Sequence, residues 1–323
     1  MLLDGWDVGD GWRGRDFFRR FLEQDPTFAD ENVWVAAEGE ELVSCVQVFP
    51  RQIRIRGVPV PMGGIGSVFT APEKRGCGLA RELMDRAATS MVERGMEVGM
   101  LFPAPDRMDW YRRQGWGTWK RRRLWVSGGP RVPSSAVGSV PSPSTASSVP
   151  SRFDAQRDFE SLRRVHAGYS GALDGTEVRA DGLWEASLRN AGNPGEDFWV
   201  VRAHPGEVVA YARATLLAGL PVLTEFGRAP GAEWELVQVV AKAVDERAVV
   251  PDLAHEPGLE QALVGCGFET RPLEDPLTML RCLDPAALVR RLGLRVQDRE
   301  VPNALLQRLL PPERLHYWVA DRF

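Results

Sequence analysis

Residues 62–95 combine an apolar segment, a glycine-rich turn and an amphipathic helix in one continuous stretch. Residues 65–70 are apolar and β-branched enough for a buried strand, which Pro72 ends. After the turn, apolar side chains recur at steps of three and four residues, at Leu79, Ala80, Leu83, Met84, Ala87, Ala88 and Met91. This spacing predicts a helix with one buried face, which ends at Gly95. The stretch therefore predicts a strand, a tight turn and a helix that packs against the strand.

The turn itself, residues 75–80, reads Arg-Gly-Cys-Gly-Leu-Ala. Its two glycines let the backbone turn tightly, so that several N–H groups point in one direction at the positive end of the helix dipole. Such a turn favours bound phosphate; the alternative is a loop that only separates two core elements. Nucleotide-binding loops fit less well, because no G-K-[ST] follows and Arg81 stands where the third glycine of G-x-G-x-x-G would fall.

The turn resembles the acetyl-CoA site of the GNAT superfamily of N-acetyltransferases. Arg75-x-x-Gly78-x-Ala80 matches the R-x-x-G-x-G/A signature with which that family binds the pyrophosphate of acetyl-CoA. The resemblance implies a cofactor site formed by Val68, Phe69, Thr70, Lys74, Arg75, Gly76, Cys77, Gly78, Leu79 and Ala80. We interpret Cys77 as a small loop residue rather than a nucleophile, because a thiol packed under a diphosphate is badly placed to attack an acyl group.

A second resemblance lies at residues 110–116, Trp-Tyr-Arg-Arg-Gln-Gly-Trp, where a short predicted helix, residues 106–114, ends. The segment is similar to the Y-x-x-x-G-[FYW] run in which many GNAT enzymes place a tyrosine as general acid for the departing thiolate. The resemblance implies this role for Tyr111. The alternative is a core tyrosine with its hydroxyl at the edge of the core, which is common on short helices.

The rest of the first half is predicted to form a sheet around this stretch. Strands are predicted at residues 33–37, 42–49, 53–60, 65–70, 98–102 and 118–126. The first three are expected to form an antiparallel meander with a break at Pro50-Arg51, preceded by a helix at residues 12–24. GNAT domains open with a strand, for which only Met1-Leu2-Leu3 is left, so we expect that strand to be missing or replaced. The basic residues 120–123 are interpreted as an exposed sheet end rather than a nucleic-acid patch.

Residues 127–152 contain nine serines and five prolines, which predicts a flexible linker. The elements predicted after it repeat the order of the first half. They are helices at residues 153–166, 183–189, 232–244 and 257–266, and strands at residues 198–203, 208–217, 222–226, 248–253 and 277–283. Gly267-Phe268 follows Gly115-Trp116 by 152 residues.

This second half lacks the chemistry of the first. The same shift of 152 residues places Leu263 where the first half has Tyr111. The segment at residues 227–233 has no spaced glycines, and the nearby carboxylates of Glu225 and Glu233 would repel phosphate. We therefore predict a GNAT-like second domain that shapes or supports the first without catalysing.

The predicted fold class is α+β, with two tandem GNAT-like domains, each a mixed, mostly antiparallel sheet flanked by helices. The expected parts are a catalytic domain at residues 1–126, the linker at 127–152, a degenerate domain at 153–284 and a C-terminal helical tail at 285–323. Two such domains, of which only the first is active, resemble the Eis (enhanced intracellular survival) type of acetyltransferase. That type continues into a sterol-carrier-like domain, which we expect to be absent or truncated here.

Composition limits the function classes. A net charge of −4 gives no overall attraction to nucleic acid, so a small-molecule or peptide amine is the expected acceptor. Asp25, Asp30 and Glu31 are compatible with a cationic one. The chain has neither a segment apolar enough for a membrane nor a signal peptide, which predicts a cytoplasmic protein, and its four scattered cysteines and four histidines predict no metal site. A homo-oligomer is compatible with the resemblance.

The resemblance implies acetyl-CoA-dependent transfer of acetyl directly to a primary amine; a non-catalytic acyl-CoA-binding module is the alternative. Direct transfer needs a base, and residues 63–70 carry no carboxylate. The tail is unusually apolar, with Leu305, Leu306, Leu309 and Leu310 before Pro311-Pro312 and an aromatic segment after them, which predicts burial. In Eis-like enzymes the terminal carboxylate of a phenylalanine reaches the transfer site, which makes Phe323 the candidate base. The alternative is a tail that only fills an apolar groove.

Overall fold

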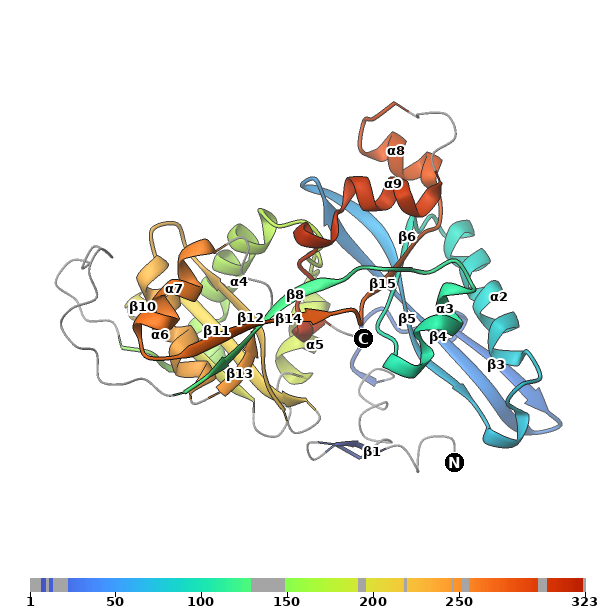
Figure 1. The fold of residues 1–323 in the computed structure, drawn as a ribbon, viewed down its shortest axis with the longest axis horizontal. Helices are drawn as coiled ribbons and strands as arrows, with labels where there is room; N and C mark the ends of the chain where they lie inside the picture. The colour runs from blue at the N-terminus through green and yellow to red at the C-terminus, as the bar shows by residue number, and fades with distance from the viewer. Residues whose placement is uncertain are drawn as a thin grey trace.

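The computed structural model describes residues 7–9, 12–13, 23–128, 149–190, 196–217, 220–245, 247–250, 256–295 and 301–321. Two mixed sheets, each flanked by helices, lie side by side, and long strands pass between them (Figure 1). The predicted fold class is thereby confirmed. In the described part of the chain, no helix is both long enough and apolar enough to cross a membrane.

The first sheet has the strand order β3-β4-β5-β6-β15-β7. Its strands are β3 (Val33–Glu38), β4 (Glu41–Ile55), β5 (Val58–Thr70), β6 (Val98–Leu101), β15 (Met279–Cys282) and β7 (Gly117–Thr118). Only the pairing of β5 with β6 is parallel. Helix α2 (Leu79–Glu93) and the short helix α3 (Met108–Arg112) pack on one face, whereas α8 (Pro285–Arg291) and α9 (Pro302–Leu309) pack on the other.

The second sheet has the strand order β14-β8-β13-β12-β11-β10-β9. Its strands are β14 (Glu269–Asp275), β8 (Arg121–Ser127), β13 (Arg247–Val250), β12 (Leu220–Arg228), β11 (Glu207–Leu217), β10 (Asp197–His204) and β9 (Ser151–Arg152). Helices α6 (Glu233–Val244) and α7 (Pro257–Gly265) cover one face. Helices α4 (Ala155–Gly171) and α5 (Asp181–Asn190) cover the other.

The two halves exchange strands. The sequence predicts residues 118–126 as the last strand of the first domain, but β8 pairs with β13 and β14 of the second sheet. In return, β15 from the second half inserts between β6 and β7 of the first sheet. The prediction placed β8 in the wrong sheet because a strand's length and composition do not encode its distant partner. Each sheet is consequently completed by the other half of the chain.

The hairpin β4-β5 is longer than the predicted meander. Instead of breaking at Pro50-Arg51, β4 continues to Ile55 and turns at Arg56-Gly57, both of which have positive φ. Proline is tolerated here because β3 pairs with β4 no further than Gln47, so the proline nitrogen costs the sheet no ladder hydrogen bond. The two predicted strands at residues 42–49 and 53–60 are therefore wrong in their boundaries.

The structure describes only part of the segment in which a helix was predicted at residues 12–24. Strands β1 (Asp7–Gly9) and β2 (Trp12–Arg13) pair with each other in a separate two-stranded sheet, so the predicted helix does not begin at Trp12. Residues 14–22, where the rest of that helix was expected, lie outside the described residues.

The tail after α9 is buried, as its composition predicts. Tyr317 belongs to the core between the first sheet and helices α8 and α9, whereas its neighbour Trp318 belongs to the core between the second sheet and helices α6 and α7. The ring of Tyr317 lies 5.7 Å from that of Phe102, and the ring of Trp318 lies 5.1 Å from that of Phe226. The tail thus packs into the cores of both halves and connects them.

Candidate active site

The two parallel strands of the first sheet differ in length at the candidate site. Residues Met62 to Ile65 of β5 pair with Val98 to Leu101, after which β6 ends and β5 continues to Thr70. Ser67 has a φ of 51°, and the register with β4 shifts there, as in a β-bulge. The edge of residues 66–70 that faces β6 is therefore left without the parallel ladder. This edge includes Val68, Phe69 and Thr70, which the resemblance to GNAT enzymes assigns to the cofactor site.

The glycine turn directly follows this strand. Gly76 and Gly78 both have a φ of 83°, a left-handed conformation that favours glycine, and α2 begins at Leu79. No side chain caps the N-terminus of α2. The turn is solvent-exposed, and a Cβ atom at either glycine would meet nothing within 4 Å. The first N–H groups of α2 therefore face an open, positively polarised space that suits a diphosphate.

Basic side chains border the turn. Arg75 Nε donates to the carbonyl oxygen of Thr70 at 3.2 Å, which fixes the exposed arginine beside the end of β5. Lys74 forms an ion pair with Glu38, and this hydrogen bond raises the pKa of Lys74. Cys77 is exposed. The cluster of residues that the sequence predicts for the cofactor, 68–70 and 74–80, thus lies together at one end of β5.

Tyr111 lies on α3 and is 8% exposed. It belongs to the same buried apolar cluster as Ile65 of β5, and Val68 of β5 packs against this cluster. Its ring contacts that of Trp110 edge to face at 4.8 Å. Burial raises the pKa of Tyr111 to about 12, which keeps the phenol protonated at neutral pH.

The structure does not describe the residue that was predicted as the base. Phe323 lies outside the described residues, which end at Asp321. Asp25, which was expected near the acceptor, forms a buried ion pair with Arg51. The Asp25 side chain is 4% exposed and the Arg51 side chain is 6% exposed. Asp30 and Glu31 are exposed.

Sequence reasoning missed a buried ionic network between the second half of the chain and the tail. Arg179 links Glu225 on β12, at 2.7 Å, to Asp321 of the tail, at 2.6 Å. Glu225, predicted to repel phosphate, is instead buried and paired. The partners are far apart in the sequence, and no local pattern signals such a network.

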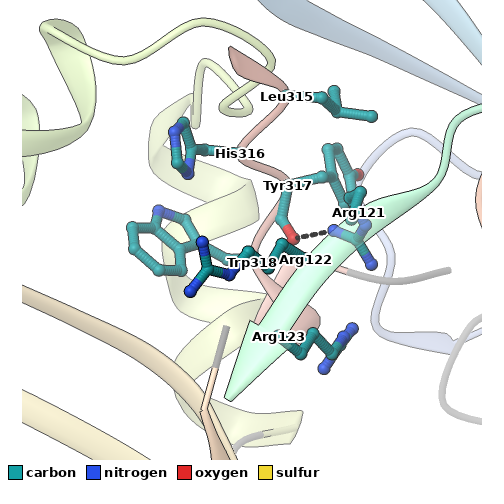
Figure 2. Close-up of a pocket in the computed structure, with 7 residues that line it drawn as sticks. All are labelled: Arg121, Arg122, Arg123, Leu315, His316, Tyr317 and Trp318. Carbon is teal, nitrogen blue, oxygen red and sulfur yellow. Dashed lines mark hydrogen bonds between the residues drawn. The ribbon is translucent and has the colours of Figure 1, made fainter. Parts of the chain in front are cut away.

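The basic residues 120–123 were predicted to form an exposed sheet end, and Lys120 and Arg122 are exposed, but the other two differ. Arg121 and Arg123 are buried, and both donate to Asp275 Oδ2, at 3.1 and 2.6 Å. Figure 2 shows the small pocket at this junction, where β8 meets the tail and Arg121 donates to the Tyr317 carbonyl oxygen at 3.1 Å. Both arginines neutralise Asp275, and Arg121 also joins the exchanged strand β8 to the tail.

Comparison with known proteins supports the assignment of the first half of the chain. Residues 10–119 match the model of the acetyltransferase (GNAT) domain. A comparison with curated protein sequences finds no match to the chain.

Solved structures share the fold over most of the chain. A probable N-acyltransferase of unknown function from Enterococcus faecalis V583 has a TM-score of 0.63 at 17% identity, over 86% of this chain and 67% of that one. A GCN5-related N-acetyltransferase from Kribbella flavida has a TM-score of 0.61 at 18% identity, over 89% and 68% of the two chains. Eis1 from Mycobacterium abscessus has a TM-score of 0.58 at 16% identity, over 85% and 72%. At these identities the likeness shows the fold. The chain is therefore an enzyme with a GNAT acetyltransferase domain at residues 10–119.

Proposed function

We propose that this enzyme transfers acetyl from acetyl-CoA directly to a primary amine at the end of strand β5, with Tyr111 as general acid. One observation carries the proposal. The open N-terminus of α2, the unpaired edge of β5 and Tyr111 all lie around the same end of the first sheet. Each feature suits one part of acetyl-CoA. The N-terminus of α2 suits the diphosphate, the unpaired edge of β5 suits the acyl thioester, and Tyr111 suits the sulfur that leaves as a thiolate.

The cofactor is held mainly by backbone groups. The N–H groups at residues 76–80 receive the diphosphate, with Arg75 adding a charge-assisted contact. The N–H groups of Val68, Phe69 and Thr70 hold the pantetheine and polarise the acetyl carbonyl. Because the strand is already fixed by β4, this stabilisation costs no reorganisation during the reaction.

In the reaction, the nitrogen lone pair of the deprotonated amine attacks the thioester carbonyl carbon. The tetrahedral intermediate collapses, the C–S bond breaks, and Tyr111 gives its phenolic proton to the sulfur. The nitrogen of the new amide releases one proton, which restores the phenol of Tyr111. The proton that the acceptor ammonium loses beforehand goes to a base, for which we propose the α-carboxylate of Phe323. Fusing a few residues after Phe323 is then expected to abolish turnover and leave CoA binding nearly unchanged. Normal kinetics of such a fusion would refute this base and leave the other assignments intact.

The finer classification is also a proposal. The tandem arrangement and the fold shared with Eis1 of M. abscessus favour an Eis-like enzyme whose second domain is inactive. The acceptor class that fits is a small-molecule or peptide amine, and we expect a cytoplasmic protein.

A non-catalytic acyl-CoA-binding module would use the same turn, so binding and turnover must be measured on one sample. Calorimetry with CoA tests the turn, and thiol release from acetyl-CoA with a panel of primary amines tests transfer. The proposal expects binding together with release for at least one amine. Tight binding without release for any amine would favour the module, and no binding at all would overturn both.

A further inference from the structure

The tail is held by one hydroxyl that faces two hydrogen-bond acceptors. Tyr317 Oη lies 2.9 Å from Glu177 Oε2 and 2.9 Å from the backbone carbonyl oxygen of Asp321. Glu177 follows α4 and forms an isolated bridge with Ile53 of β4. Its side chain is 3% exposed. The contact therefore joins the tail to the first sheet in a dry environment.

A proton count at this contact determines the state of Glu177. A tyrosine hydroxyl carries one hydrogen and can donate it to only one of the two oxygens. A backbone carbonyl only accepts, so the hydroxyl must donate to Asp321 if that contact is attractive. The second contact is then attractive only if Glu177 Oε2 carries a proton and donates it to Tyr317. If Glu177 were ionised, the single hydroxyl hydrogen of Tyr317 could serve only one contact. In the other contact two oxygen atoms would face each other with no hydrogen between them.

The charges around Glu177 agree with this count. Arg51 Nε lies 3.3 Å from Glu177 Oε1 and also pairs with Asp25. Arg179 is shared between Glu225 and Asp321, and Arg213 reaches Glu225 at 3.2 Å. Three guanidinium groups thus face four carboxylates other than Glu177; they are Arg51, Arg179 and Arg213 against Asp25, Asp321, Glu225 and Glu196. An ionised Glu177 would have to share its nearest cation, Arg51, with Asp25.

Other titratable groups adjoin the far side of this network. His166 and Tyr211 contact Glu225 at 2.8 and 2.7 Å, and Glu196 contacts Arg213 at 3.0 Å. Burial lowers the pKa of His166 and raises that of Glu196 to about 7. At Glu177, burial and then the Asp321 carboxylate raise the pKa to about 8, against the opposing effects of Arg51, Arg179 and the contact with the Tyr317 hydroxyl.

We propose that Glu177 is a positioning residue that acts as a neutral carboxylic acid: it donates to Tyr317 and thereby holds the tail segment 317–321 against the first sheet, and the segment loosens when this proton is lost. The anchoring stands independently of acetyl transfer. Its consequence for turnover rests on the proposed function, because the tail leads to Phe323.

Hydrogen–deuterium exchange of the full-length protein tests the anchoring between pH 5.5 and 9, after correction for intrinsic exchange. The reporter is the Asp321 amide, which donates to the Trp318 carbonyl oxygen at 3.1 Å. Opening that exposes Glu177 releases its proton, so wild-type protection is expected to fall by up to about tenfold per pH unit and to level off above about pH 8. Glu177→Gln keeps a donor but cannot ionise, so its protection is expected to be independent of pH.

Two further variants complete the test. Glu313→Gln removes an exposed carboxylate from the same tail and is expected to keep the wild-type pH slope. Tyr317→Phe removes the shared hydroxyl and is expected to lower protection at every pH; should it fail to fold, the comparison of wild type with Glu177→Gln decides alone. Equal pH slopes in those two proteins would overturn the proposal.

Turnover gives a separate readout. If the tail positions the proposed base, Glu177→Gln keeps kcat and the KM for acetyl-CoA within about threefold of wild type at pH 7 and loses less kcat than wild type above pH 8. If no amine is acetylated by any of these proteins, the proposed function fails, and the exchange experiment still decides the anchoring.

Discussion

Leu263 occupies in the second domain the position that Tyr111 occupies in the first. The Tyr111 carbonyl oxygen accepts from the Trp116 N–H at 3.2 Å, and the Leu263 carbonyl oxygen accepts from the Phe268 N–H at 3.1 Å. A glycine with positive φ follows each helix within three residues, with a φ of 82° at Gly115 and 94° at Gly267. The predicted shift of 152 residues is therefore a structural equivalence. A leucine has no proton to give, so the second domain lacks the group proposed as the acid.

Removing the arginine at the turn tests the diphosphate site. Arg75→Ala is expected to weaken CoA binding by about 1.5–3 kcal/mol, because a charge-assisted phosphate contact is lost. Isothermal titration calorimetry measures the change. Arg290→Ala, which removes an exposed arginine from α8, is the matched control and should bind CoA like wild type. Equal affinities of Arg75→Ala and wild type would contradict the role of Arg75.

A pair of substitutions at Gly78 separates charge from backbone conformation. Asparagine and aspartate have nearly the same size and both tolerate a positive φ, which is 83° at this position, and neither Cβ would meet an atom within 4 Å. Only Gly78→Asp places a carboxylate in the anion site. It is expected to bind CoA at least about tenfold more weakly than Gly78→Asn, a difference of about 1.4 kcal/mol. Equal binding by the two variants would show that no anion is held here.

The proposed neutral state of Glu177 predicts a pH-dependent stability. The pKa is raised from 4.5 to about 8 in the folded protein, so folding takes up a proton between these values. This contribution is fully present below pH 4.5 and is lost as pH rises towards 8. Urea denaturation is expected to show the free energy of unfolding of wild type falling relative to that of Glu177→Gln, by at most about 1.4 kcal/mol per pH unit. Parallel pH profiles of the two proteins would contradict it.

The exchanged strands predict that neither half folds alone. A fragment of residues 1–128 lacks β15, which lies between β6 and β7, and it exposes β8 without its partners. We expect this fragment to be unfolded or aggregated by circular dichroism when expressed alone. Coexpression with residues 149–323 is expected to give a stable complex that copurifies through a tag on one fragment. A folded, monomeric 1–128 fragment would show that the exchange is dispensable.

These elements also show where sequence reasoning reached its limit. Helix α2 and the glycine turn were predicted closely, because apolar spacing and glycine placement are local signals. Pro50 misled the prediction, since a proline ends a strand only where its nitrogen faces a partner. The placement of β8 and the pairing of Arg179 with Asp321 depend on residues more than a hundred positions away, for which one sequence contains no pairing signal.

The most direct test of the central claim is the rate of thiol release from acetyl-CoA by wild type and Tyr111→Phe with the best amine of the panel. The account predicts that Tyr111→Phe lowers kcat by about 10²–10⁴-fold, as for the loss of one positioned proton donor, while CoA affinity changes little. Trp110→Phe, which alters the ring packed against Tyr111 but keeps the hydroxyl, is the control and should retain most of the activity. Wild-type kcat in Tyr111→Phe would contradict the account and return Tyr111 to a purely structural role.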